Sequence, residues 1–170
     1  MTQAKKCEAV AAVRILETLM RHGEDILCSP SMQRSRDYTH HKRISVYEHS
    51  IGVAYMSLLL AFKFGLRINE KALVRGALLH DYYLYDWHDH ASWHRLHGLR
   101  HPGFASKNAE RDFEIGEIEK DIILKHMFPL TPVPPLYKES AIVCAVDTGC
   151  AMMEYFSYDY IAPLIKGAVL

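Results

Sequence analysis

The chain has 170 residues, of which 49% are hydrophobic, and this length and composition suit one domain with a sizeable core. Lysine and arginine together number 20, as do aspartate and glutamate, so the charge gives no strong indication of nucleic acid or an anionic membrane as partner. No repeat, low-complexity tract or charge run divides the sequence, and we therefore predict a single domain over residues 1–170.

The N-terminus and the cysteines bear on the compartment. The sequence MTQAKKCEAVAAV lacks the long apolar core and the cleavage site of a secretory signal. The longest apolar stretch, around residues 56–64, is too short to span a bilayer. No CxxC spacing occurs among the four cysteines, which we interpret as free thiols: Cys7, Cys28, Cys144 and Cys150. These features predict a cytoplasmic protein that does not enter a membrane.

Apolar residues recur at helical spacing in several segments. We predict helices over residues 4–21, 46–64, 70–79, 102–113, 116–127 and 137–155, and a weaker final helix over 159–169. The pair His22-Gly23 is expected to end the first helix, and Asn69 to cap the third. Residues 24–44 are predicted to be irregular, and residues 82–100, rich in aromatic side chains and histidine, to form a loop over the site.

Two proline-containing segments refine this prediction. Pro102 suits the first position of a helix, which makes His101 the expected N-cap. The sequence PLTPVPP over residues 129–135 predicts an extended, rigid connection rather than a helix. Since no segment shows the alternation typical of strands, the predicted fold is all-α, a bundle of six or seven helices with a site inside it.

Several histidines and aspartates lie where a soluble protein buries apolar side chains. Asp147 is the only charged residue in segment 140–153, where an uncompensated carboxylate would be strongly destabilising. His49 and His126 each share a helical stripe with aliphatic residues. A lone histidine of this kind is usually a hydrogen-bonded core residue, but several on separate helices predict a metal centre. The candidate ligands are His49, His80, Asp81, His101, His126 and Asp147.

The adjacent pair His80-Asp81 is the centre of the predicted site. Neighbouring residues at a helix end project in directions about 100° apart and can approach one cavity. A carboxylate has two oxygens, so Asp81 can bridge two cations. Imidazole and carboxylate together suit Fe, Mn, Zn, Co or Ni rather than calcium. We therefore predict one or two divalent transition-metal ions, one held by His49, His80, Asp81 and Asp147, the other by Asp81, His101 and His126.

The ordered set resembles the HD superfamily of metal-dependent phosphohydrolases. The resemblance covers residues 43–154, and its landmarks read RISVYEHSIGVA, RGALLHDYYLYDWH, HGLRHP, IILKHMFP and IVCAVDTG. It implies an all-α fold in which the first histidine, the HD pair and the late aspartate bind the primary metal, which here are His49, His80, Asp81 and Asp147. Histidines at positions 101 and 126 are similar to those of the two-metal branch. Tyr82-Tyr83-Leu84 after the HD pair and Met127 after His126 depart from the branch that cleaves cyclic dinucleotides.

Polar residues near the predicted ligands are candidates for further roles. Asp86 is expected to accept a proton or to orient a ligand histidine, and its alternative role is to cap a loop. Arg43 is the preferred phosphate-binding cation among those before the His49 helix, where the alternative is a solvated surface. Glu48 is a candidate general base or partner of His49, although its place at a helix start favours a surface role.

The aromatic and histidine-rich segment after the HD pair leaves two questions open. Its aromatic side chains can stack on a nucleobase, but for at least two of them we expect packing or loop anchoring: Tyr82, Tyr83, Tyr85 and Trp87. Its histidines and aspartates, at positions 86 to 97, can be taken as a second metal cluster. A solvated loop is the preferred interpretation, because no inward apolar context surrounds them.

The function favoured by this pattern is hydrolysis of a phosphate ester of a nucleotide or another small phosphorylated metabolite. A metal-activated hydroxide would attack phosphorus, with Asp81 as the bridge and Arg43 on the outer phosphoryl oxygens. The same ligand order also resembles that of HD-fold di-iron oxygenases acting on small polyols or phosphonates. A metal-stabilised binding module is a third possibility. The sequence does not specify the substrate, the native metal or whether the protein forms a homo-oligomer.

Overall fold

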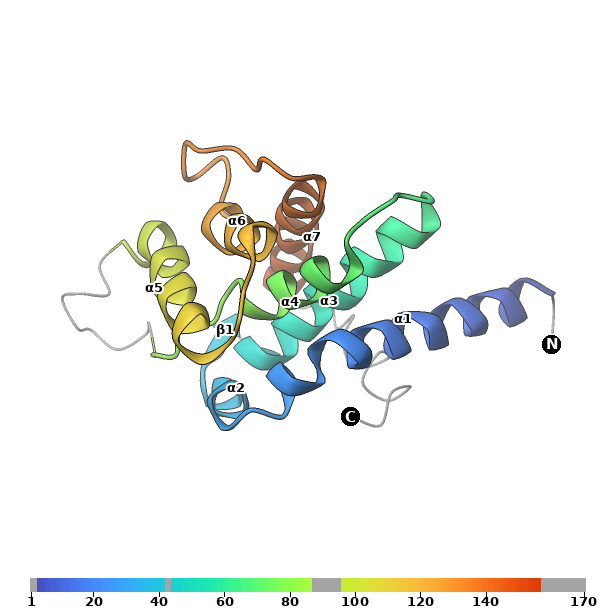
Figure 1. Ribbon diagram of the computed structural model, residues 1–170, viewed down its shortest axis with the longest axis horizontal. Coiled ribbons are helices and arrows are strands. Elements are labelled where there is room, and N and C mark those ends of the chain that lie inside the picture. Colours follow the sequence, from blue (N-terminus) through green and yellow to red (C-terminus); the bar gives the residue numbers. More distant parts are fainter. Residues whose placement is uncertain (1–2, 42–43, 87–95, 157–170) are drawn as a thin grey trace.

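A computed structural model describes residues 3–41, 44–86 and 96–156, and helices make up most of this part of the chain (Figure 1). The α-helices are α1 (Gln3–Leu27), α2 (Pro30–Arg34), α3 (Val46–Lys63), α4 (Glu70–Leu79), α5 (His97–Asp112), α6 (Glu117–Lys125) and α7 (Lys138–Tyr155). The prediction of an all-α fold with six or seven helices is confirmed. The predicted helix over residues 159–169 lies outside the described residues.

Helix α1 continues beyond the His22-Gly23 pair, where the sequence predicted its end. The reason lies in the packing of Gly23, since a Cβ atom there would lie 2.4 Å from Leu78 Cδ1. The glycine therefore permits a close approach of α1 to α4 instead of ending the helix. Ile26 and Leu27 in the additional turn are buried, which stabilises the longer helix.

A short hairpin occupies part of the segment that was predicted to be irregular. After α2 and the 3-10 turn Ser35–Asp37, strand β1 (Thr39–His41) pairs antiparallel with β2 (Ile44–Ser45). The side chain of Ser45 then accepts a hydrogen bond from the backbone N–H of Glu48 at 3.2 Å, which starts α3. The hairpin thus delivers the chain directly to the first turn of α3.

Helix α4 lies at the centre of the described helices and contacts α1, α3, α6 and α7. Every residue from Ala72 to Leu79 is buried, which is possible because helices surround α4. The one cation in this stretch, Arg75, is compensated by Asp25 of α1, whose two carboxylate oxygens lie 2.7 and 2.8 Å from Nη1. This ion pair joins α1 to α4.

Helix α5 begins at His97, five residues before the predicted start at Pro102. His101 is therefore not an N-cap but lies in the second turn. The earlier turn is supported by the side chain of His101, whose Nδ1–H donates to the carbonyl of His97 at 3.0 Å. Pro102 consequently lies inside α5 rather than at its first position.

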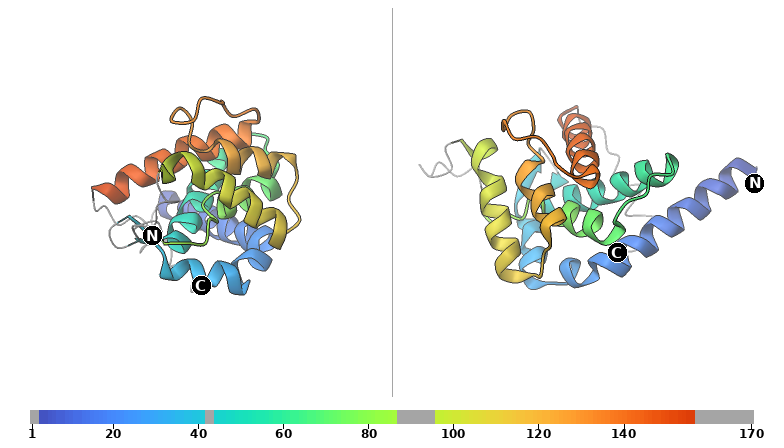
Figure 2. Two further views of the ribbon diagram at one scale, coloured as in Figure 1. Left: turned by 90° about the vertical axis from the view of Figure 1, so that its left-hand side faces the viewer. Right: turned by 45° about the horizontal axis from the view of Figure 1, so that its top comes forward.

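Helix α7 runs over nearly the predicted residues and places Asp147 near its middle, beside α3 and α6. Residues 129–135, which connect α6 to α7, form turns and bends rather than one extended segment. In Figure 2 the first turns of α1 project beyond the other helices. Among the described helices, none has both the length and the apolar composition that crossing a bilayer requires.

The contact between α4 and α6 depends on Gly76, where a Cβ atom would lie 2.4 Å from Ile122 Cδ1 and 3.0 Å from its Cβ. We expect Gly76→Ala to lower the free energy of unfolding by about 1–3 kcal/mol, because the core must shift to admit the methyl group. Urea unfolding followed by circular dichroism measures this change. Gly103→Ala in α5 is the matched control, because a Cβ there meets nothing within 4 Å. Equal stability of the two variants would contradict the packing argument.

Candidate metal centre

The structure brings all six candidate ligands together in one buried cluster. They come from five helices: His49 from the first turn of α3, His80 and Asp81 from the C-terminal end of α4, His101 from α5, His126 from the end of α6 and Asp147 from α7. None of the six is more than 8% exposed. Four of the six lie at a helix terminus, where their side chains enter the cluster without interrupting the apolar faces of the helices.

One side of the cluster is formed around Asp147. Its Oδ1 lies 3.0 Å from His49 Nε2 and 3.5 Å from His80 Nε2. His80 Nε2 also lies 3.6 Å from Asp81 Oδ2. We call this side, with His49, His80, Asp147 and the Oδ2 atom of Asp81, the first pole.

The other side is formed around the second oxygen of Asp81. Its Oδ1 lies 3.1 Å from His101 Nε2 and 3.5 Å from His126 Nε2. The two Nε2 atoms of His101 and His126 lie only 2.7 Å apart. We call Asp81 Oδ1, His101 and His126 the second pole. The carboxylate of Asp81 therefore faces both poles, one oxygen to each, as a bridging ligand must.

Backbone carbonyls orient three of the imidazoles. In each, Nδ1–H donates to a carbonyl oxygen three or four residues earlier in the chain, and the opposite nitrogen, Nε2, points into the cluster. The distances are 2.7 Å from His80 to Ala77, 3.0 Å from His101 to His97 and 2.8 Å from His126 to Ile123. Because a carbonyl only accepts, Nδ1 carries the hydrogen, and the neutral ring presents a lone pair on Nε2. This is the tautomer that ligates a metal through Nε2.

These donors fit a bound cation. The Nε2 lone pairs of neutral His101 and His126 would face each other at 2.7 Å, an arrangement that requires a proton or a metal ion between them. Buried His80 Nε2 and Asp81 Oδ1 make no hydrogen bond within the described residues. Polar atoms buried in this way are destabilising unless something compensates them. Imidazole nitrogen and carboxylate oxygen together suit a divalent transition metal.

The carboxylates of the cluster and two of its histidines stabilise each other's charged forms. Burial would raise the pKa of Asp81 and Asp147, but the neighbouring histidines outweigh it and hold both carboxyls well below their usual pKa. Burial lowers the pKa of His49 and His80, yet the carboxylates beside them raise it to about 9 in each. For His126 burial prevails, and its pKa is lowered. His126 is therefore neutral near pH 7, as metal ligation requires.

A comparison with protein-family models matches the HD domain to residues 46–152, more than half of the chain. The chain belongs to the HD-domain family. Proteins of this family are typically metal-dependent phosphohydrolases. Comparisons with curated proteins and with solved structures gave no match. The match begins at the first residue of α3 and ends within α7, so it spans the five helices that form the cluster.

Two residues outside the matched region join the cluster, and sequence reasoning missed both. His40 of β1 lies with Nε2 3.1 Å from Asp81 Oδ2, and Glu154 of α7 lies with Oε1 2.7 Å from His49 Nδ1. Glu154 was detectable, because it follows Asp147 by seven residues, two helical turns, and so shares its face of α7. His40 gave no periodic signal, since it lies in a short strand outside the apolar helices.

The other candidate residues have varied outcomes. Glu48 accepts hydrogen bonds from the backbone N–H and hydroxyl of Ser45 at 2.9 and 2.8 Å, so it caps α3 rather than orienting His49. Asp86 is exposed, and its role stays a prediction. Arg43, Trp87 and the histidines at positions 88, 90 and 94 lie outside the described residues.

Packing accounts for the tyrosines after the HD pair. Tyr82 is buried, and its hydroxyl donates to Asp112 Oδ2 at 2.9 Å. The ring of Tyr83 is buried edge-on to His97 with centroids 4.9 Å apart, and the Tyr85 hydroxyl lies 2.9 Å from His97 Nδ1. These contacts support the expectation that at least two of the aromatic residues anchor the segment.

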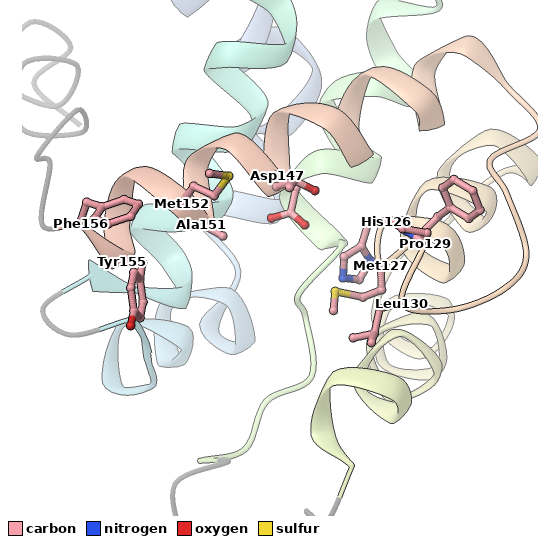
Figure 3. Close-up of a pocket in the computed structure, with 11 residues that line it drawn as sticks. His126, Met127, Pro129, Leu130, Asp147, Ala151, Met152, Tyr155 and Phe156 are labelled. Atoms are coloured by element: carbon pink, nitrogen blue, oxygen red, sulfur yellow. The ribbon is translucent and has the colours of Figure 1, made fainter.

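A pocket of about 440 Å³ opens beside the cluster (Figure 3). His126 and Asp147 line it at one end, and from there it follows α7 towards Tyr155 and Phe156. Apolar side chains form most of the remaining wall: Met127, Phe128, Pro129, Leu130, Ala151 and Met152. The pocket of this HD domain therefore has a polar end, at His126 and Asp147, and a mostly apolar lining elsewhere.

The raised pKa values of His49 and His80 predict how the metal-free HD domain responds to pH. Both values, about 9, lie above the ordinary value of 6.5. The stabilisation is therefore fully present below about pH 6.5 and is lost as the pH rises through about 9. Urea unfolding of chelator-treated protein should give a lower free energy of unfolding near pH 9 than near pH 6.5.

The control is the same protein saturated with a divalent ion. An ion replaces the protons of the cluster, so its contribution to stability should increase over the same pH range. If metal-free and metal-loaded protein respond to pH in the same way, the histidine–carboxylate pairs do not govern this dependence.

Proposed function

We propose that this HD domain is a metal-dependent phosphohydrolase that cleaves a phosphate ester of a nucleotide or another small phosphorylated metabolite. The observation that carries the proposal is the position of Asp81, whose two oxygens face two groups of histidines. Bound divalent transition-metal ions would supply an activated water and neutralise charge on the phosphoryl oxygens. The residues proposed to hold them are His49, His80, Asp81, His101, His126 and Asp147.

The chain's own residues have distinct proposed roles in the reaction. Asp81 is proposed to hold the two poles together, with one carboxylate oxygen at each. Arg43 is proposed to bind the outer phosphoryl oxygens, and Asp86 to accept a proton or orient a ligand. His126 belongs to the second pole and also lines the pocket, so a phosphoryl group at this pole would leave its organic part in the pocket.

The lining of the pocket supports an uncharged organic group as the part of the substrate that it binds. None of the described lining residues is a lysine or an arginine. A second phosphate placed there would lose its hydration without gaining a cationic partner. An aromatic or aliphatic group would instead remove apolar surface of Met127, Leu130 and Met152 from water. A nucleoside monophosphate has the required distribution, with one phosphate and a large planar base.

The role of Asp81 is tested by Asp81→Ala. We expect this change to remove most of the bound metal and reduce phosphate release to background, while the protein stays helical. Losing the bridging carboxylate removes a ligand from both poles and leaves their positive charges facing each other. Elemental analysis, circular dichroism and phosphate release from a panel of phosphomonoesters and phosphodiesters measure the three outcomes.

Two further variants make this experiment specific. Glu17→Ala removes an exposed carboxylate of α1 and should change none of the three readouts. Arg43→Ala should keep the metal and raise KM, because its proposed partner is the substrate. A wild-type protein that contains iron and consumes oxygen while leaving every phosphate ester intact would show that the site supports di-iron oxygenase chemistry instead.

The pocket assignment is tested by filling the pocket. Ala151→Trp should raise KM for a nucleoside monophosphate by about tenfold or more, equivalent to about 1.4 kcal/mol, and change KM for glycerol phosphate much less. Ala145→Trp is the matched control, because Ala145 is an exposed residue of the same helix and does not line the pocket. Steady-state kinetics with both substrates decide the outcome. A similar KM change for both substrates would contradict binding of the organic group in the pocket.

A further inference from the structure

His40 lies at the first pole although it precedes the residues that match the HD domain. Its Nε2 atom lies 3.1 Å from Asp81 Oδ2, the carboxylate oxygen that also faces His80. Its ring stacks on that of His49, with centroids 3.8 Å apart and planes inclined by 18°. The hairpin β1–β2 therefore inserts an additional imidazole beside the ligands contributed by α3, α4 and α7.

The carboxylate of Glu154 contacts the Nδ1 atom of each of the two stacked rings. Glu154 Oε2 lies 3.0 Å from His40 Nδ1, and Oε1 lies 2.7 Å from His49 Nδ1. Glu154 is 2% exposed and has a pKa lowered from its ordinary value, because its hydrogen bonds with the two histidines outweigh the effect of burial. An ionised carboxylate only accepts hydrogen bonds, so both Nδ1 atoms carry the hydrogens. The Nε2 atoms of His40 and His49 are consequently both directed towards the carboxylates of the cluster.

The position of His49 indicates that His40 faces the same candidate ion position as the other first-pole residues, not a separate one. Ligand atoms of His40, His49 and Asp81 lie within 4.8 Å of one another, and so do those of His49, His80 and Asp147. Both groups use His49, whose Nδ1 is engaged by Glu154, so both must use its Nε2. An imidazole nitrogen has one lone pair and ligates one ion. The two groups therefore describe one coordination shell.

We propose that His40 is a further protein ligand of the first-pole ion and that Glu154 is the positioning residue that orients His40 and His49 together. The proposal rests on the metal site proposed above, but not on the reaction. The first pole then offers five protein donors, three imidazoles and two carboxylates: His40, His49, His80, Asp81 and Asp147. This donor set favours a transition metal over magnesium or calcium.

The added ligand makes the two poles unequal. Five protein donors leave few coordination positions at the first pole, whereas the second pole has three, from Asp81, His101 and His126. The pocket reaches both poles, through His126 and Asp147, so the number of open coordination positions is what distinguishes them. We therefore assign tight, structural retention of an ion to the first pole and exchange with water or substrate to the second.

The test uses cobalt(II) bound to the full-length protein, compared with the variants His40→Ala and His40→Gln. Cobalt affinity is measured by competition with a fluorescent chelator. Proton NMR counts the exchangeable ring N–H signals that cobalt shifts, one for each imidazole that ligates through Nε2. We expect each variant to lose one shifted signal and to bind the first ion more weakly. Loss of a residue that only hydrogen-bonds to a ligand typically weakens metal binding by about 10- to 100-fold, and the loss here should be larger. His22→Ala, which removes a histidine of α1 outside the cluster, should change neither readout.

Glu154→Gln separates positioning from ligation. It should keep the number of shifted signals, weaken cobalt binding by about 10- to 100-fold, and alter the positions of two of them, those of His40 and His49. An unchanged signal count and affinity in both His40 variants would overturn the assignment and leave His40 as a hydrogen-bond partner of Asp81. Wild-type protein that takes up no cobalt would overturn the metal site together with it. Normal cobalt binding without hydrolysis of any phosphate ester would instead reject only the proposed reaction.

Discussion

The burial of two carboxylates, Asp81 and Asp147, is the constraint on which the rest of the structure depends. A carboxylate removed from water is strongly destabilising unless cations or hydrogen-bond donors surround it. Here the compensating groups are imidazoles that come from four helices and a strand, and no single helix supplies enough of them. The helices must therefore converge on one point, and the packing of α4 against α1, α3, α6 and α7 places the HD pair there. The arrangement of the helices and the composition of the site are two aspects of the same requirement.

Hydrogen bonds to nearby backbone carbonyls set the ring orientation of three of the candidate ligand histidines. Each of three histidines is oriented by a carbonyl three or four residues earlier in the chain, so its ring direction is set within one helical turn. The Nδ1 atoms of His40 and His49 are instead held by Glu154, which follows both residues by more than 100 positions. The second pole thus consists mainly of locally oriented rings, whereas the first depends on a contact between distant parts of the chain.

The apolar periodicity of the sequence was enough to place α3, α4, α6 and α7, and the inward polar residues of these helices were visible as exceptions to it. The errors occurred where tertiary contacts decide the local structure. Gly23 serves the approach of α1 to α4, so the helix does not end there, and a histidine side chain supports the early start of α5. His40 could not be found from periodicity, because three residues of strand have none. Its importance comes from where the hairpin lies in space.

The contacts of Glu154 show that the cluster includes residues beyond the region that matches the family. The family match extends over residues 46–152, yet His40 lies before it and Glu154 after it. Their contact joins the two flanks of the matched region across the cluster. A fragment trimmed to residues 46–152 would contain all six motif ligands and would still expose Nδ1 of the buried His49 without an acceptor. The region that matches the family is therefore narrower than the part of the chain that forms the cluster.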